Sequence, residues 1–295
     1  MCKAINLLEQ HSVEYDYIEV MLESASQNLS DEYVIVAKHC WQQLPTFDGK
    51  KIVLIENSNE THGVPREILR DDVHIIFSSY FILDQWGNPI YSHKLLPLPL
   101  PHPVAEVNNV TPINERKYDF SFIGQVQCGA RHNLRLNLEK IQEAKDCPYS
   151  YYIHYTDGFG TGIPSEEYLD ILDQSKIALC PAGDGSLETF RFFEASRAGC
   201  ITVSEQLPKL WFYEKSPWVC GRWSSIQTML QFILSREKEF LHEAHLKTLK
   251  FYEECASPYY IGKYVSHNTL NRKHDELPQS LVTIAQNQQG VQELV

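Results

Sequence analysis

Short apolar runs alternate with polar, helix-forming segments along most of the chain. Residues 51–56 and 73–81 are short runs rich in β-branched side chains, which is typical of buried strands. A polar loop at 60–65 and a short helix at 65–70 are expected between them. The order strand, short helix, strand predicts a parallel α/β unit. The apolar run within 31–43 fits either a strand or a helix.

Proline marks the boundary between this unit and the next. Four prolines fall within the seven residues 97–103, which excludes a helix or a central strand there and predicts an extended connector. We place the boundary after residue 112, so the first domain spans 1–112 and the second spans 113–265. Residues 266–295 form a polar C-terminal tail that we expect to pack back on or near the first domain.

Beyond the boundary the alternation restarts with greater regularity. Four apolar strands separated by three helical segments predict a doubly wound parallel sheet. One long amphipathic helix is expected after them, over 224–255. The strands are expected at 119–124, 150–155, 176–180 and 200–203, and the helices between them at 130–145, 165–174 and 187–198.

The composition excludes several classes of protein. Hydrophobic residues make up 43% of the 295 residues and aromatic residues 12%, so the chain is globular and not disordered. With 26 basic and 38 acidic residues the formal net charge is −12, and a surface of that sign repels polyphosphate. We expect no nucleic-acid partner. No apolar run approaches the roughly 18 residues of a membrane span, so none is expected.

A metal site and a disulfide framework are also not expected. The eight cysteines are scattered and contain no Cys-x-x-Cys pair. Asp71 and Asp72 lack the Asp-x-Asp spacing and precede a strand instead of following one. The only dense group of possible ligands, 274–276, lies in the polar tail, where solvation explains it. These patterns predict that the protein needs no metal and no cofactor.

The segment 176–203 carries the strongest functional signal. A buried strand leads into a glycine-containing loop that opens a helix, and ligands bind beyond the carboxyl ends of strands in open parallel sheets. Gly183 and Gly185 allow the backbone to approach a phosphate, and Ser186 can cap the helix. A tight strand-to-helix turn would explain the same loop, and both interpretations stay open.

The helix after this loop carries charges at three-residue steps: Glu188, Arg191, Glu194 and Arg197. These could form exposed ion pairs. Glu194, however, shares a helical stripe with apolar residues, so we expect it to be buried and to need an arginine or ligand hydroxyls, such as those of a ribose. Arg191 either binds a phosphate or neutralises Glu188 or Glu194.

Two further arginines follow the strand that ends near Gly124. Arg131 and Arg135 lie one helical turn apart, and two guanidinium groups on one helix face suit a diphosphate. Pairing with a nearby acidic residue such as Glu139 is the competing interpretation, and it applies more to Arg135 than to Arg131.

These motifs resemble the nucleotide-sugar half of the exostosin-type glycosyltransferases, family 47. The resemblance covers roughly 117–235 and includes a Cys-Pro strand end, a glycine loop, an Arg-x-x-Glu-Ala helix and a Gly-Cys-Ile strand. Thr202 stands where the family has proline, and Asp184 is an unusual negative charge in the loop. The resemblance implies a GT-B fold of the α/β class, with two Rossmann-like domains and a cleft between them.

The resemblance also implies an activity. It indicates an inverting, metal-independent hexosyl- or pentosyltransferase that moves a sugar from a nucleoside-diphosphate sugar, UDP-linked, to a glycan or glycoprotein hydroxyl. Because no export signal or anchor is seen, we expect a cytoplasmic protein of bacterial or viral type. Together the residue patterns and the resemblance assign donor binding to Gly124, Arg131, Arg135, Gly183, Gly185, Ser186, Arg191 and Glu194.

An inverting transfer also needs a base that takes the proton of the acceptor hydroxyl. Candidates in loops after strands of the first domain are Glu60, His62 and Asp84. Two alternatives stay open: a GDP-sugar-dependent GT-B enzyme such as a fucosyltransferase, and a non-catalytic partner subunit that binds a nucleotide or carbohydrate.

Overall fold

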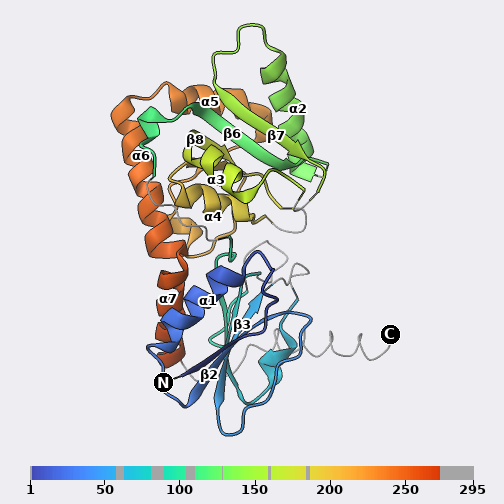
Figure 1. Cartoon of the computed structure of the whole chain (residues 1–295), viewed down its shortest axis with the longest axis vertical. Helices are drawn as coiled ribbons and strands as arrows, with labels where there is room; N and C mark the ends of the chain where they lie inside the picture. Colours follow the sequence, from blue (N-terminus) through green and yellow to red (C-terminus); the bar gives the residue numbers. More distant parts are fainter. Residues whose placement is uncertain are drawn as a thin grey trace. The chain divides into compact units, whose positions relative to one another are not determined.

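Two five-stranded parallel sheets organise the chain (Figure 1). The computed structural model describes residues 2–57, 63–80, 90–103, 110–127, 129–158, 161–183 and 187–272. Unit 1 comprises Met1–Val104, Pro208–Leu210 and Cys255–Val295, and unit 2 comprises Ala105–Leu207 and Trp211–Glu254. The sequence-based limits for the same division were 1–112, 113–265 and 266–295. Two Rossmann-like units confirm the predicted α/β class.

Unit 1 contains a parallel sheet whose strands follow chain order. It consists of β1 (Lys3–Asn6), β2 (Tyr33–His39), β3 (Lys51–Asn57), β4 (Val73–Ser78) and β5 (Leu95–Pro97), in the order β1-β2-β3-β4-β5. The segment that the sequence left open between strand and helix is therefore β2. The proline-rich connector begins as the edge strand β5, where a proline that cannot donate a hydrogen bond is tolerated.

Both faces of this sheet are covered, which explains why β2, β3 and β4 are mostly apolar. On one face α1 (Tyr15–Ser26) and α7 (Pro258–Leu270) lie side by side (Figure 1). They approach so closely that a Cβ at Gly262 would lie 2.5 Å from the carbonyl oxygen of Met21. On the other face the short 3-10 helix η1 (Arg66–Leu69) contributes Ile68 to a second apolar cluster.

Unit 2 contains a sheet whose strand order reverses. Its strands are β6 (Tyr118–Gln125), β7 (Tyr151–Thr156), β8 (Ser175–Leu179), β9 (Ile201–Ser204) and β10 (Val219–Cys220), in the order β10-β9-β8-β6-β7. The chain leaves β6 for β7 on one side and then returns to place β8 on the other side. This is the predicted doubly wound sheet, and its switch point lies at the carboxyl ends of β6 and β8.

The helices of unit 2 match the predicted positions except in the last third. They are α2 (Gly129–Glu143), α3 (Ser165–Asp173), α4 (Phe190–Arg197), α5 (Ile226–Leu234) and α6 (Lys238–Phe251). The expected single helix over 224–255 is wrong, because the chain leaves the helix after Leu234. The break lets Leu230 and Ile233 of α5 and Leu241 of α6 enter the same core.

The described residues of unit 2 also form three short 3-10 helices and one π-helix: η2 (Ile113–Glu115), η3 (Tyr213–Lys215), η4 (Trp223–Ser225) and η5 (Tyr252–Ala256), the last of which runs on into unit 1. In the part of the chain that the structure describes, no helix is both long and apolar enough to cross a membrane.

Candidate functional site

The switch point of the unit 2 sheet brings together several residues that the sequence predicts to bind a donor. The guanidinium of Arg131, in the first turns of α2, reaches the segment after β8 and donates from Nε to the carbonyl oxygen of Ala182 at 2.7 Å. Gly183 is the next residue. Ligands bind at such a switch point in open α/β sheets, so the location supports a binding site.

Arg191, in the first turn of α4, lies over the carboxyl end of β6. Its guanidinium carbon is 5.1 Å from the centre of the Phe122 ring, and Nη2 donates a hydrogen bond to the carbonyl oxygen of Ile123. Gly124 has a φ of +151°, and a Cβ at this position would collide with Nη2 of Arg191. The glycine therefore makes room for the arginine, a packing role that the sequence pattern did not predict.

The remaining donors of Arg191 are not satisfied by the described residues. Its Nε and Nη1 atoms are buried and have no hydrogen-bond partner there. The two carboxylates that could have neutralised it, Glu188 and Glu194, each accept a hydrogen bond from a tyrosine. Buried polar atoms without partners are rare in folded proteins. Two N–H groups of this cation are therefore buried without an acceptor among the described residues.

Glu194 is a half-buried residue of α4, and it does not belong to a ladder of exposed ion pairs. The hydroxyl of Tyr168, on α3, donates to its Oε2 at 2.6 Å. Burial raises the pKa of Glu194, while the hydrogen bond from Tyr168 and the charges of Arg191 and Arg197 oppose the rise. The tyrosine was not among the predicted site residues, because nothing in its local sequence distinguishes it from other half-buried tyrosines.

Glu188 lies just before α4 and is only 2% exposed. The hydroxyl of Tyr213 donates to its Oε1 at 2.8 Å, and burial raises the pKa of the carboxyl to about 8. The sequence placed Glu188 on the helix, but α4 begins at Phe190 with Thr189 in the N-cap position. Ser186, predicted to cap this helix, lies outside the described residues.

Arg135 is placed differently from Arg131. It is exposed on α2, and its Nε donates to Oε1 of Glu139 at 2.7 Å in an i,i+4 ion pair. Its guanidinium carbon also lies 5.4 Å from the centre of the Tyr155 ring. The competing interpretation from the sequence, pairing with Glu139, is thus what the structure contains, and the donor-binding role of Arg135 stays a prediction.

The remaining predicted residues lie outside the described part of the chain. These are the three candidate bases, Glu60, His62 and Asp84, and the loop residue Gly185. Among the described residues, no three His, Cys, Asp or Glu side chains are grouped so that they could hold a metal ion. Independence from metal remains a prediction.

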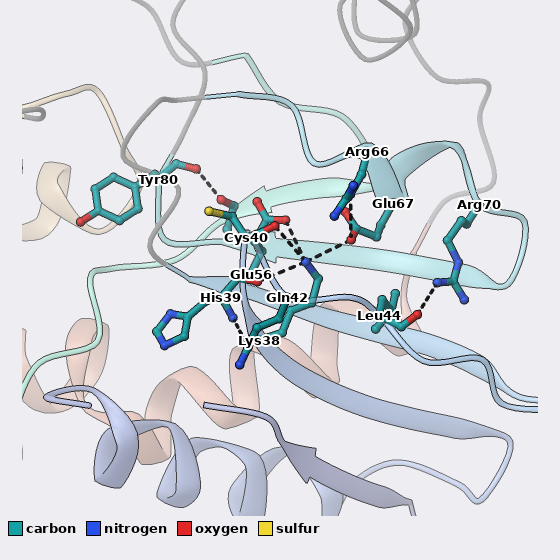
Figure 2. Close-up of polar contacts among 11 residues, drawn as sticks. Lys38, His39, Cys40, Gln42, Leu44, Glu56, Arg66, Glu67, Arg70 and Tyr80 are labelled. Carbon is teal, nitrogen blue, oxygen red and sulfur yellow. Dashed lines mark hydrogen bonds and ion pairs between the residues drawn. The ribbon is translucent and has the colours of Figure 1, made fainter. Parts of the chain in front are cut away.

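A buried cluster of charged residues in unit 1 escaped the sequence analysis (Figure 2). Lys38, near the end of β2, is fully buried, and its Nζ lies 3.0 Å from Oε1 of Glu67 and 3.8 Å from Oε2 of Glu56. A signal was available in part, because Lys38 and Glu56 each lie next to the last residue of a largely apolar strand. Glu67 sits in a short 3-10 helix that has no such pattern.

The match to a known protein family concerns mainly unit 2. The family model described as RXYLT1 C-terminal domain matches residues 101–249, just over half of the chain. No curated protein sequence matches.

Among solved structures, the chain is similar to the GtfA/B complex, with a TM-score of 0.46, 11% identity, and coverage of 90% of this chain and 60% of that one. It is also similar to AviGT4, described as a glycosyltransferase involved in avilamycin A biosynthesis, with a TM-score of 0.47 and 11% identity; the match covers 92% and 97% of the two chains. A third is the pneumococcal O-GlcNAc transferase GtfA in complex with UDP and GlcNAc, with a TM-score of 0.33, 11% identity, and coverage of 93% and 59%.

Proposed function

The chain belongs to the RXYLT1 C-terminal domain family, and from that membership we propose that it is an exostosin-like glycosyltransferase whose donor site lies at the carboxyl edge of the unit 2 sheet. The donor is a nucleoside-diphosphate sugar, uridine-linked, and the acceptor is a hydroxyl of a glycan or glycoprotein. Transfer inverts the anomeric configuration and requires no metal ion.

The observation that carries this proposal is that two buried nitrogens of Arg191, Nε and Nη1, have no hydrogen-bond acceptor among the described residues. A buried guanidinium costs free energy unless its donors and its charge are matched. Here one N–H bonds to the carbonyl oxygen of Ile123, the ring of Phe122 covers one face, and Nε and Nη1 have no acceptor among the described residues. The phosphates of a nucleoside diphosphate can supply acceptors for these two donors.

Neighbouring groups extend the same site. Arg131 is fixed by its bond to Ala182 O, so its guanidinium is held at the segment that leads into the glycine loop. The backbone of Gly183 and Gly185 allows close approach of a phosphate. Glu194 accepts from Tyr168, and a carboxylate oriented by one hydroxyl is suited to accept from the hydroxyls of the ribose.

In the proposed reaction the acceptor oxygen attacks the anomeric carbon on the face opposite the nucleotide. The new C–O bond forms as the bond to the diphosphate breaks, and a base removes the acceptor proton. Glu60, His62 and Asp84 remain our candidates for the base. The charge that develops on the leaving diphosphate is met by Arg131 and Arg191, which do the work that a divalent cation performs in other phosphate sites.

Isothermal titration of the full chain with UDP, GDP and uridine tests the donor site. Arg191→Ala should weaken UDP binding by roughly 30- to 1,000-fold, corresponding to ~2–4 kcal/mol, and uridine binding far less. Arg236→Ala is the matched control, because it removes an equal charge from an exposed position of unit 2 that stacks on Phe232.

Three outcomes would contradict the proposal. Equal weakening of UDP and uridine would mean that Arg191 supports the fold and does not contact phosphate. Absence of UDP binding by the unmodified chain, together with binding of GDP, would replace the uridine nucleotide by a guanosine nucleotide. Turnover that is lost in excess chelator and restored by magnesium or manganese would overturn the metal-free mechanism.

A further inference from the structure

An exposed tryptophan stands on the turn that follows β2, at the carboxyl edge of the unit 1 sheet. The side chain of Trp41 is 64% exposed, although tryptophan is among the residues with most to gain from burial. One face of the indole stacks on the imidazole of His39, with ring centroids 4.4 Å apart and planes 10° apart. The opposite face is left to solvent. Folding has thus oriented a large flat apolar surface without covering it.

The turn beneath Trp41 is held by hydrogen bonds at both ends. The backbone N–H of Gln42 donates to His39 O at 3.0 Å, and the side chain of Gln42 accepts from His39 N at 2.8 Å. The amide nitrogen of Gln42 then donates to Leu7 O at 2.7 Å, which ties the turn to the chain after β1. Three bonds from one glutamine fix the two residues that flank Cys40 and Trp41.

The buried cation of unit 1 supports the same turn (Figure 2). Nζ of Lys38 donates to His39 O at 3.3 Å and to Cys40 O at 3.5 Å, in addition to its ion pairs with Glu67 and Glu56. In Figure 2 the imidazole of His39 points away from this cluster. Burial lowers the pKa of His39, which favours the neutral ring that stacks under the indole.

A second, independent observation concerns polar groups at the ends of the neighbouring strands. Asn57, the last residue of β3, is 2% exposed and is the register partner of His39. Its Nδ2 is buried and has no hydrogen-bond partner among the described residues, and the same holds for Oγ of Ser79, just after β4. Buried polar atoms nearly always have a hydrogen-bond partner. At this edge of the sheet, two such atoms have none among the described residues.

We propose that the outer face of Trp41 is the platform on which a pyranose ring of the carbohydrate acceptor stacks. The proposal rests on the proposed function and assigns a residue and a ligand class to its acceptor side. The C–H face of a pyranose is flat and apolar and its hydroxyls project from the ring edge, so it can cover an indole while the hydroxyls stay hydrogen-bonded. Because the indole is already held on His39, little side-chain entropy is lost when the sugar binds.

Saturation-transfer NMR and titration of the full chain with methyl β-D-xylopyranoside, methyl β-D-galactopyranoside and methyl β-D-glucuronide test this platform. Trp41→Ala should weaken binding of the preferred pyranoside by about two- to tenfold, which is the range expected for one aromatic stacking contact. Trp41→Phe should retain most of the affinity. Gln42→Ala, which releases the turn but keeps the indole, should have an intermediate effect.

Tyr259→Ala is the matched control, because Tyr259 is an aromatic residue of the same unit with 54% exposure and a position on α7. It should leave pyranoside affinity unchanged. Trp41 is exposed, so its removal does not open the core, and a thermal melt of each variant checks this.

UDP affinity, measured on the same samples, separates this inference from the proposed function. Unchanged UDP binding with weakened pyranoside binding in Trp41→Ala supports the platform. Unchanged pyranoside binding in Trp41→Ala would contradict the proposed platform. So would a wild-type chain that binds none of the three pyranosides. Neither result would affect the proposed donor site. Loss of uridine binding in Trp41→Ala would also overturn the platform, because the indole would then stack on a nucleobase. Failure of the wild type to bind any nucleotide counts against the proposed function, whichever way the pyranoside result falls.

Discussion

Each sheet has a cation at its carboxyl edge, fully buried Lys38 in unit 1 and half-buried Arg191 in unit 2, and the two cations differ in how their hydrogen-bond donors are satisfied. In unit 1 Nζ of Lys38 contacts two carboxylates and two carbonyl oxygens, all supplied by the fold. In unit 2 the guanidinium of Arg191 has one carbonyl acceptor, an aromatic ring and two buried nitrogens without a partner among the described residues. The fold therefore satisfies the cation of unit 1 with its own groups, whereas two donors of Arg191 have no acceptor among the described residues.

The two sheets, whose cations differ in this way, also differ in strand order. In unit 1 the strands follow chain order, so the strand order does not reverse. In unit 2, β7 and β8 lie on opposite sides of β6, and the connections diverge at its carboxyl end, where Arg191 lies. Sheet architecture alone does not identify a site. In unit 2 a switch point coincides with a cation that has two donors without a described acceptor, and this coincidence supports the donor site that we propose.

The largest expected effect is on the free energy of unfolding, and it comes from removing Lys38, whose charge is paired with two buried carboxylates. Lys38→Met should lower the free energy of unfolding by ~3–5 kcal/mol, because Glu56 and Glu67 would remain buried without a counter-charge. Denaturant unfolding checks this, with Lys51→Met as the control. Lys51 pairs with Glu32 at 3.1 Å, but both side chains are about half exposed, so its loss should cost less than about 1 kcal/mol.

Arg191→Met sharpens the same comparison. Since no described carboxylate depends on Arg191 through a hydrogen bond, its loss should cost much less stability than the loss of Lys38. If Arg191→Met lowered the free energy of unfolding as much as Lys38→Met, both cations would stabilise the fold to the same extent, and the proposed difference between them would be wrong.

The second effect concerns nucleotide affinity. Arg131→Ala should weaken UDP by roughly 30- to 1,000-fold, corresponding to ~2–4 kcal/mol, because a guanidinium already anchored on Ala182 O would be lost from the diphosphate. Uridine should be affected far less, and Arg131→Lys should restore only part of the affinity, since an ammonium supplies charge without the planar fork. Equal weakening of UDP and uridine would assign Arg131 to the fold alone.

The elements of unit 2 could largely be predicted from sequence, whereas β1, α1 and α7 of unit 1 were not predicted. The strands β3, β4, β6, β7, β8 and β9 show as apolar runs between helical segments, and the wrong helix over 224–255 shows the limit of that signal. An amphipathic pattern continues across residues 235–237 because both flanking helices face the same core, so periodicity cannot reveal the break.

The candidate site could be predicted only in part. Arg131, Arg191 and Glu194 stand in a recognisable motif, whereas their roles depend on partners far away in sequence. Tyr168 and Tyr213 bind the two glutamates through hydroxyls, and no local pattern indicates which of the 16 tyrosines does so. Whether Arg191 is neutralised could not be read from its spacing to Glu188 and Glu194.

The third effect is a pH dependence of stability in unit 2. The carboxyl of Glu188 has a pKa of about 8 when folded and about 4.5 when unfolded. Between these values the folded state holds a proton that the unfolded state has lost, so this group makes stability fall as pH rises, by ~1.4 kcal/mol per pH unit, and contributes no further change above about pH 8. Glu188→Gln should remove that slope.

The measurement is the difference in unfolding free energy between the wild type and Glu188→Gln at pH 5 and pH 7. The unfolding free energy of Glu188→Gln minus that of the wild type should be larger at pH 7 than at pH 5. A constant difference would mean that Glu188 is ionised in the folded state. Glu243→Gln is a suitable control, because the exposed carboxylate of Glu243 pairs with Lys247 on the surface of α6.

The smallest effect is expected at Arg135, and it tests the contrast between two arginines of one helix. Arg135 is exposed and already paired with Glu139, so Arg135→Ala should change stability by only ~0.3–0.5 kcal/mol. Its effect on UDP affinity should stay within about fivefold, since a surface charge contributes at most ~1 kcal/mol in screened solvent. Titration in 50 mM and 300 mM salt separates screening from contact, because a through-space effect fades at high salt and a direct phosphate bond persists. A loss as large as that of Arg131→Ala, retained at high salt, would show that Arg135 leaves Glu139 to bind phosphate when the donor arrives, and the site would then contain three arginines.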